Sequence, residues 1–229
     1  MKRQITLLMM ALVAIATYAQ KDVTTFLGIP VDGFKPAMEK KLIAKGFVPQ
    51  KTENDVYFEG EFNGSKVNVF IVTNNNKVWR IMLVDVINRS EADIKTRFNT
   101  LVNQFKNNKR YVDLDETSTL PDSEDISYEM AVNNKIYEAT FYQDLDFEKL
   151  DTLAMNEQVR KKLLEKYTPE QLQEPTDEIL EKEAMIKALL MLDCFYKKSV
   201  WFRIRETYGK YYITMFYDNE YNHANGEDL

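Results

Sequence analysis

Apolar and polar residues alternate with period two in several short segments of this chain, and tight turns separate these segments. Asp55–Phe62 alternates in this way and is followed by Asn63-Gly64, a dipeptide that accepts positive φ angles. Lys66–Thr73 and Lys77–Asp85 continue the alternation. Such alternation is typical of strands with one buried face. The chain is therefore expected to fold around antiparallel meanders.

The alternating pattern recurs later in the chain. Asp55–Gly64 aligns with Asp125–Asn134, which is accordingly predicted to be a strand and a turn that lead into a further strand, Lys135–Gln143. Lys77–Asp85, the third strand of the first unit, is matched to Val200–Ile204. We interpret this pattern as an internal repeat of two units. A coincidental match between two amphipathic hairpins is the alternative.

A helix is expected at the start of each unit. In the first unit, Met38, Leu42 and Ile43 form an apolar stripe that ends at Gly46. In the second unit, Ser90 is a predicted N-cap. The apolar face of this second helix is predicted to consist of Ile94, Phe98, Leu101, Val102 and Phe105.

The second unit also contains a predicted helical insertion, at about residues 146–197. Its last helix is apolar on much of its circumference from Ile179 to Phe195, so we expect it to be buried against a sheet or against a partner. The expected fold class is α+β, with two helix-plus-antiparallel-meander units. These units are assigned to residues 20–88 and 89–229.

Residues 1–19 have the pattern of a signal peptide. A basic start precedes an almost unbroken apolar run, Ile5–Ala16, which is too short for a membrane anchor. Thr17-Tyr18-Ala19 provides the small residues that a signal peptidase reads, so cleavage is predicted after Ala19. The protein is therefore expected to be periplasmic or secreted. No transmembrane segment is expected once the signal is removed.

Charge and rare residues exclude several classes of function. The formal net charge is −6 and becomes more negative when the basic signal is removed, which argues against nucleic acid as a partner. Cys194, the only cysteine, cannot form an intramolecular disulfide and is expected to be buried and inert, with an intermolecular disulfide as the alternative. His223, the only histidine, excludes multi-histidine metal sites and is expected to be an exposed bystander. No cofactor and no metal ligand is assigned.

Two predicted strands each place an arginine close to a tryptophan, and the last strand is rich in aromatic residues. Such side chains bind carboxylates or stack at interfaces. Alternatively, the two arginines are outward-facing charges that pair with glutamates such as Glu59 and Glu129. The candidate binding residues are Trp79, Arg80, Trp201, Arg203, Tyr212 and Phe216.

Three functions are compatible with these patterns. The first is a non-catalytic exported binding module whose candidate residues contact a protein or an envelope component. The second is a carboxylate-based hydrolase acting on glycans, for which two acidic residues suffice. The third is a calcium-stabilised structural protein, because Asp218–Leu229 is rich in oxygen ligands.

The two ends of the mature chain carry a resemblance to known proteins. Phe26–Gly33 (FLGIPVDG), Tyr217–Asn222 (YDNEYN) and Ala224–Leu229 (ANGEDL) resemble an uncharacterised family of exported proteins of Gram-negative gut-type bacteria. This resemblance implies location and no activity. In architecture, Gly-Ile-Pro followed by a helix and a meander is similar to SmpA/OmlA-like domains, and two such units are similar to β-lactamase inhibitor proteins. The chain lacks the lipidation cysteine of the former and the disulfides of the latter, and similarity of fold does not transfer function.

Overall fold

The structure is a computed structural model that describes residues 22–53 and 55–224. The predicted signal peptide and the end of the oxygen-rich tail lie outside the described residues. In chain order the described elements are β1 (Thr25–Phe26), β2 (Ile29–Pro30), α2 (Lys35–Ala44), β3 (Val48–Lys51), β4 (Val56–Phe62), β5 (Ser65–Asn74), β6 (Lys77–Asp85), α3 (Glu91–Lys106), β7 (Tyr111–Val112), α4 (Ile126–Val132), β8 (Glu138–Gln143), α5 (Thr152–Leu164), α6 (Asp177–Tyr196), β9 (Ser199–Thr207), β10 (Lys210–Asp218) and the 3-10 helix η1 (Glu220–Asn222).

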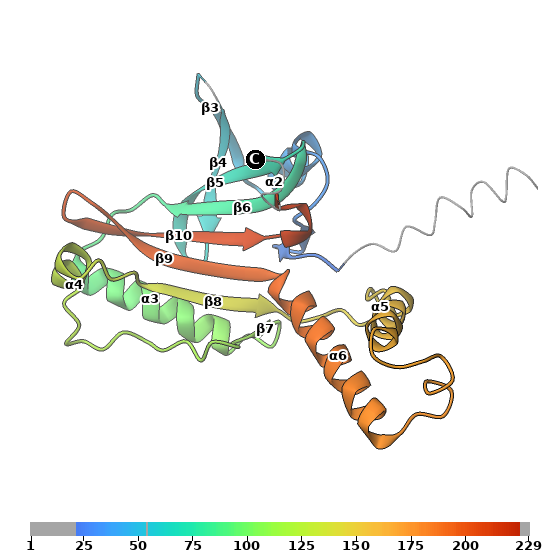
Figure 1. The fold of residues 1–229 in the computed structure, drawn as a ribbon. Helices are drawn as coiled ribbons and strands as arrows, with labels where there is room; N and C mark the ends of the chain where they lie inside the picture. Colours follow the sequence, from blue (N-terminus) through green and yellow to red (C-terminus); the bar gives the residue numbers. More distant parts are fainter. Residues whose placement is uncertain (1–21, 54, 225–229) are drawn as a thin grey trace, which may run out of the picture. The chain divides into compact units, whose positions relative to one another are not determined.

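One antiparallel sheet of eight strands forms the centre of the fold. The strand order is β3-β4-β5-β6-β10-β9-β8-β7, so β6 and β10 meet in the middle (Figure 1). Each half consists of a helix followed by four strands in sheet order, α2 with β3 to β6 and α3 with β7 to β10. The expected α+β class is confirmed, and the two meanders join edge to edge in a single sheet.

Three hairpins in the sheet share the same turn chemistry. Asn63-Gly64, Asn75-Asn76 and Tyr208-Gly209 each have positive φ angles at both turn residues. Turns of this kind match the right-handed twist of the strands that they connect. The turn predicted at Asn63-Gly64 is therefore confirmed.

The prediction of a strand at Asp125–Asn134 is wrong, because Ile126–Val132 within this segment form the helix α4. The Asp125 side chain caps this helix by accepting a hydrogen bond from the Tyr128 backbone N–H at 2.8 Å. Ile126 and Met130 are four residues apart, which suits one face of a helix as well as one face of a strand. In the sheet, Lys77–Asp85 (β6) corresponds to β10 and not to the β9 segment Val200–Ile204.

The main core lies between one face of the sheet and the helices α2 and α3. Met38 and Leu42 of α2 are buried as predicted, but Ile43 is 48% exposed. Ile43 follows Leu42 by one position, which is about 100° around a helix, so the two side chains face different ways. Ser90 caps α3 as predicted, by accepting a hydrogen bond from the Asp93 backbone N–H at 3.2 Å. The predicted apolar face of α3 is buried throughout: Ile94, Phe98, Leu101, Val102 and Phe105.

The helices predicted between the second and third strands of the second unit are present as α5 and α6. Leu145–Asp193 form a compact unit of their own, separate from the unit that contains the sheet. The core of this helical unit is small and consists of Val159, Leu163 and Ile186 with Tyr167, Leu172 and Leu190 packed against it.

Within the chain itself, the last helix is buried on only part of its surface. Ile179 and Ile186 are buried, whereas Met185, Leu189 and Leu192 are exposed. A helix that packs on a single neighbour buries only one stripe of its surface. The prediction that Cys194 is buried is wrong, because this residue is only half-buried.

Candidate functional site

The strands of the sheet alternate between the face covered by α2 and α3 and the opposite face, which we call the outer face. Core residues such as Ile81, Phe202 and Met215 point toward the helices, so their neighbours along each strand point away from them. On the three central strands the outer face is formed by Arg80, Met82, Trp201, Arg203, Arg205, Tyr212, Thr214, Phe216 and Asp218.

Trp79 joins this face through a β-bulge. Val72 opposes Arg80 and Thr73 opposes Val78, so Trp79 is an extra residue in β6 relative to β5. A bulge breaks the alternation and redirects a side chain. As a result Trp79 lies beside its neighbour, with its ring centre 4.2 Å from the Arg80 guanidinium carbon.

Arg80 forms a two-point ion pair with Asp218 of the adjacent strand. The Arg80 Nε and one terminal nitrogen donate to the two Asp218 oxygens, each at 2.6 Å. Trp201 Nε1 donates a third hydrogen bond to Asp218, at 2.8 Å, and Asp218 is only 2% exposed. Arginine fits a carboxylate well in this geometry. The charge of Arg80 is therefore compensated inside the face, by Asp218 and not by one of the glutamates considered as alternatives.

Aromatic rings hold this ion pair in place. Trp201 and Phe216 are stacked, with ring centres 4.0 Å apart and an interplanar angle of 21°. The Arg80 guanidinium lies 4.7 Å from the Phe216 ring centre and 5.3 Å from that of Trp201. Cation–π contacts of this kind are strengthened where water is excluded. We call Trp79, Arg80, Trp201, Phe216 and Asp218 the aromatic–arginine cluster.

Residues after β10 cover one side of the cluster. The Asn219 backbone N–H donates to the Trp79 carbonyl at 2.7 Å, and the His223 ring lies 4.4 Å from the Trp79 ring. His223 Nδ1 is 3.1 Å from the Glu220 carboxylate, whose pKa is raised by burial. His223 is exposed as expected, and its ring contacts both Trp79 and Glu220.

The segments Phe26–Gly33 and Tyr217–Asn222 meet next to this cluster. Asn219 Nδ2 donates to the Val31 carbonyl at 2.8 Å, and Asn222 Nδ2 donates to the Asp32 carboxylate at 2.7 Å. The Thr24 hydroxyl also donates to the backbone carbonyl of Asp218. These bonds give the two motifs a shared structural role, because each end fixes the position of the other.

Arg203 lies on the same face but has a different environment. Its guanidinium is 5.5 Å from the Trp201 ring centre, and within the described residues it forms no ion pair. Its Nε is buried without a hydrogen-bond partner, as is the hydroxyl of its cross-strand neighbour Thr214. Each buried polar group without a partner costs roughly 1–3 kcal/mol. Arg203 is therefore incompletely satisfied, whereas Arg80 is fully paired.

Tyr212 extends the outer face away from the cluster. It opposes Arg205 in the register of β9 and β10 and is half-buried. Its ring makes no stacking contact with another ring in the part of the chain that the structure describes. The structure thus brings five of the six candidate residues into contact and leaves Tyr212 at the margin of the same face.

A second group of polar residues lines a pocket beside β8, which we call the β8 pocket; its lining includes Glu124, Lys135, Tyr137 and Glu138. Lys135 and the Tyr137 hydroxyl both donate to Glu124, and the hydrogen bond from Lys135 is the main reason that the pKa of Glu124 is lowered. Burial raises the pKa of Glu138. The pKa values of these two carboxyl groups are shifted in opposite directions, as in the acid–base pairs of hydrolases. This pocket is therefore the candidate site for the hydrolase alternative.

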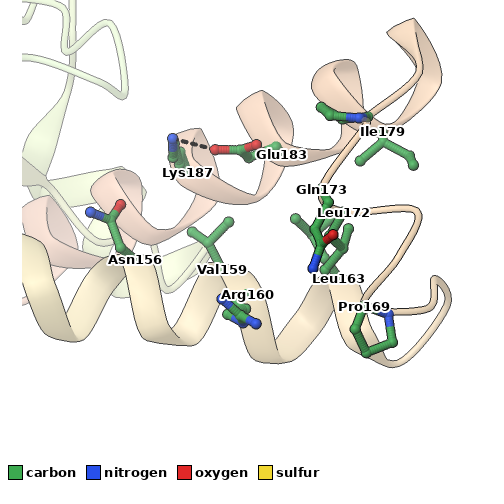
Figure 2. Close-up of a pocket in the computed structure, with 11 residues that line it drawn as sticks. Asn156, Val159, Arg160, Leu163, Pro169, Leu172, Gln173, Ile179, Glu183 and Lys187 are labelled. Atoms are coloured by element: carbon green, nitrogen blue, oxygen red, sulfur yellow. Dashed lines mark hydrogen bonds and ion pairs between the residues drawn. The ribbon is translucent and has the colours of Figure 1, made fainter.

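Another hollow lies within the helical unit, between α5, α6 and the segment that connects them (Figure 2). Its lining includes the apolar side chains of Val159 and Leu163. On the α6 side, Lys187 pairs with Glu183 at 2.5 Å, as the dashed line in Figure 2 shows. None of the candidate residues from the sequence lies in this hollow.

Comparisons with protein-family models, with curated proteins and with solved structures find no match to the chain. Within residues 22–53 and 55–224, no group of three or more histidine, cysteine, aspartate or glutamate side chains is arranged to hold a metal ion. No helix in those residues is long and apolar enough to cross a membrane.

Proposed function

We propose that this chain is a non-catalytic binding module that contacts a protein or an envelope component through its outer face. The observation that carries the proposal is the aromatic–arginine cluster, in which residues from β6, β9 and β10 assemble around one ion pair. Fixed aromatic rings and arginines lose little conformational entropy on binding and are enriched at protein interfaces. Phe216 and Asp218 are buried beneath the half-buried Trp79, Arg80 and Trp201, so these three side chains would provide a rigid contact surface on the sheet face.

The proposed place of action is outside the cytoplasm, in the periplasm or the medium. The basic and apolar pattern of residues 1–19 supports this part of the proposal. We also propose that the two halves arose by internal duplication. The order of helix and strands, which is the same in both halves, supports this origin.

The test is affinity capture from the envelope fraction of the native cells, with the full chain as bait. Trp201→Ala combined with Arg203→Ala is compared with the unchanged chain, and Tyr212→Ala is tested separately because its ring has no stacking partner among the described residues. Loss of the same captured component in both variants is expected. Circular dichroism and thermal unfolding confirm that each variant is folded.

Matched controls carry the same substitutions away from the outer face. Tyr208→Ala changes a fully exposed tyrosine at the tip of the β9–β10 hairpin, and Arg160→Ala changes an exposed arginine on α5. Both are expected to retain capture. Capture that is unchanged in folded outer-face variants would contradict the proposal.

A carboxylate-based glycan hydrolase is the second candidate, and the β8 pocket is the observation that favours it. Glu138, with its raised pKa, would act as the proton donor, and Glu124 would stay ionised. Release of reducing ends from soluble glycans by the unchanged chain, and its loss in Glu138→Gln, would support this function. Equal release by both chains would exclude these residues as the catalytic pair.

A further inference from the structure

A hollow of about 650 Å³ lies at the N-terminal end of α3 and shares no lining residue with the aromatic–arginine cluster or the β8 pocket. Its walls come from the turn Asn63-Gly64, from residues 87–89 after β6, from α3 between Ser90 and Thr100, and from Lys210. Residues 90, 93, 97 and 100 of the lining recur at helical spacing, so one side of α3 faces the hollow. We call this hollow the α3 pocket.

Positive charge gathers in the α3 pocket. Arg89, Arg97 and Lys210 line it, and two carboxylates contact these groups or share the lining, Asp85 and Asp93. Three cationic groups against two carboxylates leave one net positive charge, in a chain whose net charge is −6. Lys210 is exposed and forms no ion pair within the described residues. The pocket is therefore opposite in sign to the molecule as a whole and would attract an anion.

The two arginines of the pocket are held with different strength. Arg89 donates to the Asp85 carboxylate at 2.7 Å and to the Ser65 hydroxyl at 3.0 Å. Arg97 donates to the same carboxylate from two nitrogens, each at 3.4 Å, which is beyond the usual range of about 2.7–3.2 Å. The side chains of Arg89 and Arg97 keep 15% and 9% of their surface exposed. Because a guanidinium has five N–H groups, both arginines retain donors for a ligand, and those of Arg97 are the less committed.

Neutral donors complete the lining. The Asn88 amide and the Thr100 hydroxyl line the pocket, are exposed, and have no hydrogen-bond partner in the described part of the chain. The N-terminus of α3 adds the partial positive charge of its helix dipole. Among the described residues no aromatic ring lines the pocket. The lining therefore suits a charged, oxygen-rich ligand better than an apolar one.

We propose that the α3 pocket binds a phosphate or sulfate group carried by a small polar molecule such as a sugar. The three cationic side chains would face its oxygens, and Asn88 and Thr100 would donate further hydrogen bonds. Such a group has at least three acceptor oxygens, so it can use donors from several wall segments at once, whereas a carboxylate has two. The volume lies within the range of about 300–1,000 Å³ that is typical of small-molecule sites, so we expect an ester rather than a bare ion. This site goes beyond the proposed outer-face function and does not depend on it.

Isothermal titration calorimetry of the full chain tests the site with five probes: glucose 6-phosphate, glucose 6-sulfate, glucose, inorganic phosphate and inorganic sulfate. At least one ester is expected to bind at least about tenfold more tightly than glucose and than its own inorganic ion. Its affinity should fall as sodium chloride is raised from about 20 mM to about 200 mM, because salt screens the attraction. The ester that binds more tightly identifies the group as phosphate or sulfate.

Three variants locate the binding in the α3 pocket. Lys210→Gln is expected to weaken the ester at least about threefold, because it removes one of the three cationic groups. Lys77→Gln is the matched control and should leave the affinity unchanged: Lys77 is also exposed and also begins a strand after a two-residue turn with positive φ angles, but it lies outside the pocket. Asp93→Asn removes a carboxylate from the lining and is expected to tighten binding at least about twofold. Thermal unfolding confirms that each variant is folded.

Several results would overturn the inference. No binding of any of the four anions would do so, as would an inorganic ion that binds as tightly as its ester. Unchanged affinity in folded Lys210→Gln would place the ligand elsewhere. An equal loss in Lys77→Gln would show that the anion responds only to the net charge of the protein, and weaker binding in Asp93→Asn would contradict the expected repulsion. Capture through the outer face is measured separately, so either proposal can fail alone.

Discussion

Arg80 and Arg203 occupy the same sheet face, but their surroundings give them different roles. Arg80 is locked to Asp218 by two hydrogen bonds of 2.6 Å and lies against three aromatic rings, so it organises the cluster. Arg203 has a single ring contact and a buried nitrogen without a partner. Substitution of the first should therefore lower stability, and substitution of the second should lower binding.

Arg80→Met is expected to destabilise the protein by about 3–5 kcal/mol, because it leaves the buried Asp218 carboxylate without its cation. Lys35→Met is the matched control, since Lys35 pairs with Asp55 at a similar distance of 2.7 Å on the exposed surface. Its expected cost is below about 1 kcal/mol. Urea unfolding monitored by tryptophan fluorescence compares the two variants. If both variants lose the same free energy of unfolding, burial does not govern the strength of the Arg80–Asp218 ion pair.

The sequence identifies most of the cluster but not its centre. Trp79, Arg80, Trp201 and Phe216 were predictable, because tryptophan and arginine stand out in strand patterns. Asp218 was missed because it follows the apolar run of β10 and resembles the start of a polar tail. The spacing of Thr214, Phe216 and Asp218 by two residues could have identified it, since strand alternation places all three side chains on one face. The bulge at Trp79 depends on pairing with β5, so no local pattern reveals it.

At the scale of elements, the first meander depends on a close contact between Gly60 of β4 and the Phe47 ring. A Cβ added at Gly60 would lie 2.6 Å from Phe47 Cε1, far inside van der Waals contact. Phe47 is buried, so its ring has little room to move. The glycine is therefore needed for close packing rather than for a special backbone angle.

Gly60→Ala is expected to cost about 1–3 kcal/mol through overpacking against Phe47. Phe47→Leu also destabilises the protein, because it leaves a cavity. The double variant should be more stable than the sum of the two single losses predicts, since the smaller side chain gives space for the new methyl group. Thermal denaturation of the three variants measures this coupling. Strict additivity would contradict the proposed contact.

Element type was predictable where a pattern was long and failed where it was short. The predicted α3 stripe extends over three turns and is buried throughout, and the strand Lys77–Asp85 has the predicted bounds. The segment Asp125–Asn134 was misassigned because a pattern of so few residues is compatible with both a strand and a short helix. The capping aspartate at its start favours the helix, and this signal was outweighed by the resemblance to the first hairpin.

At the scale of the whole molecule, buried tyrosines make the fold sensitive to alkaline pH. Burial raises the pKa of the Tyr217 hydroxyl well above 10 and that of Tyr142 to about 12. In the unfolded chain a tyrosine ionises near pH 10. The folded state therefore retains protons that the unfolded state loses. Stability is fully present below about pH 10 and falls as the pH rises above it.

Tyr217→Phe is expected to flatten this alkaline loss, because the substituted residue cannot ionise in the unfolded state. At neutral pH it should cost about 1 kcal/mol for the lost hydrogen bond to Tyr111. Urea midpoints measured between about pH 8 and about pH 10.5 separate the two effects. An alkaline loss of the same slope in the variant and the unchanged chain would mean that Tyr217 does not contribute to it.

Photo-crosslinking tests whether the outer face contacts a partner. A benzoylphenylalanine replaces Met82, which lies next to Phe216 on the outer face, in the full chain produced in native cells. The matched position is Lys40, which is exposed on α2 beyond the other face of the sheet. A discrete adduct is expected from position 82 and none from position 40. Adducts from both positions, or from neither, would contradict this contact.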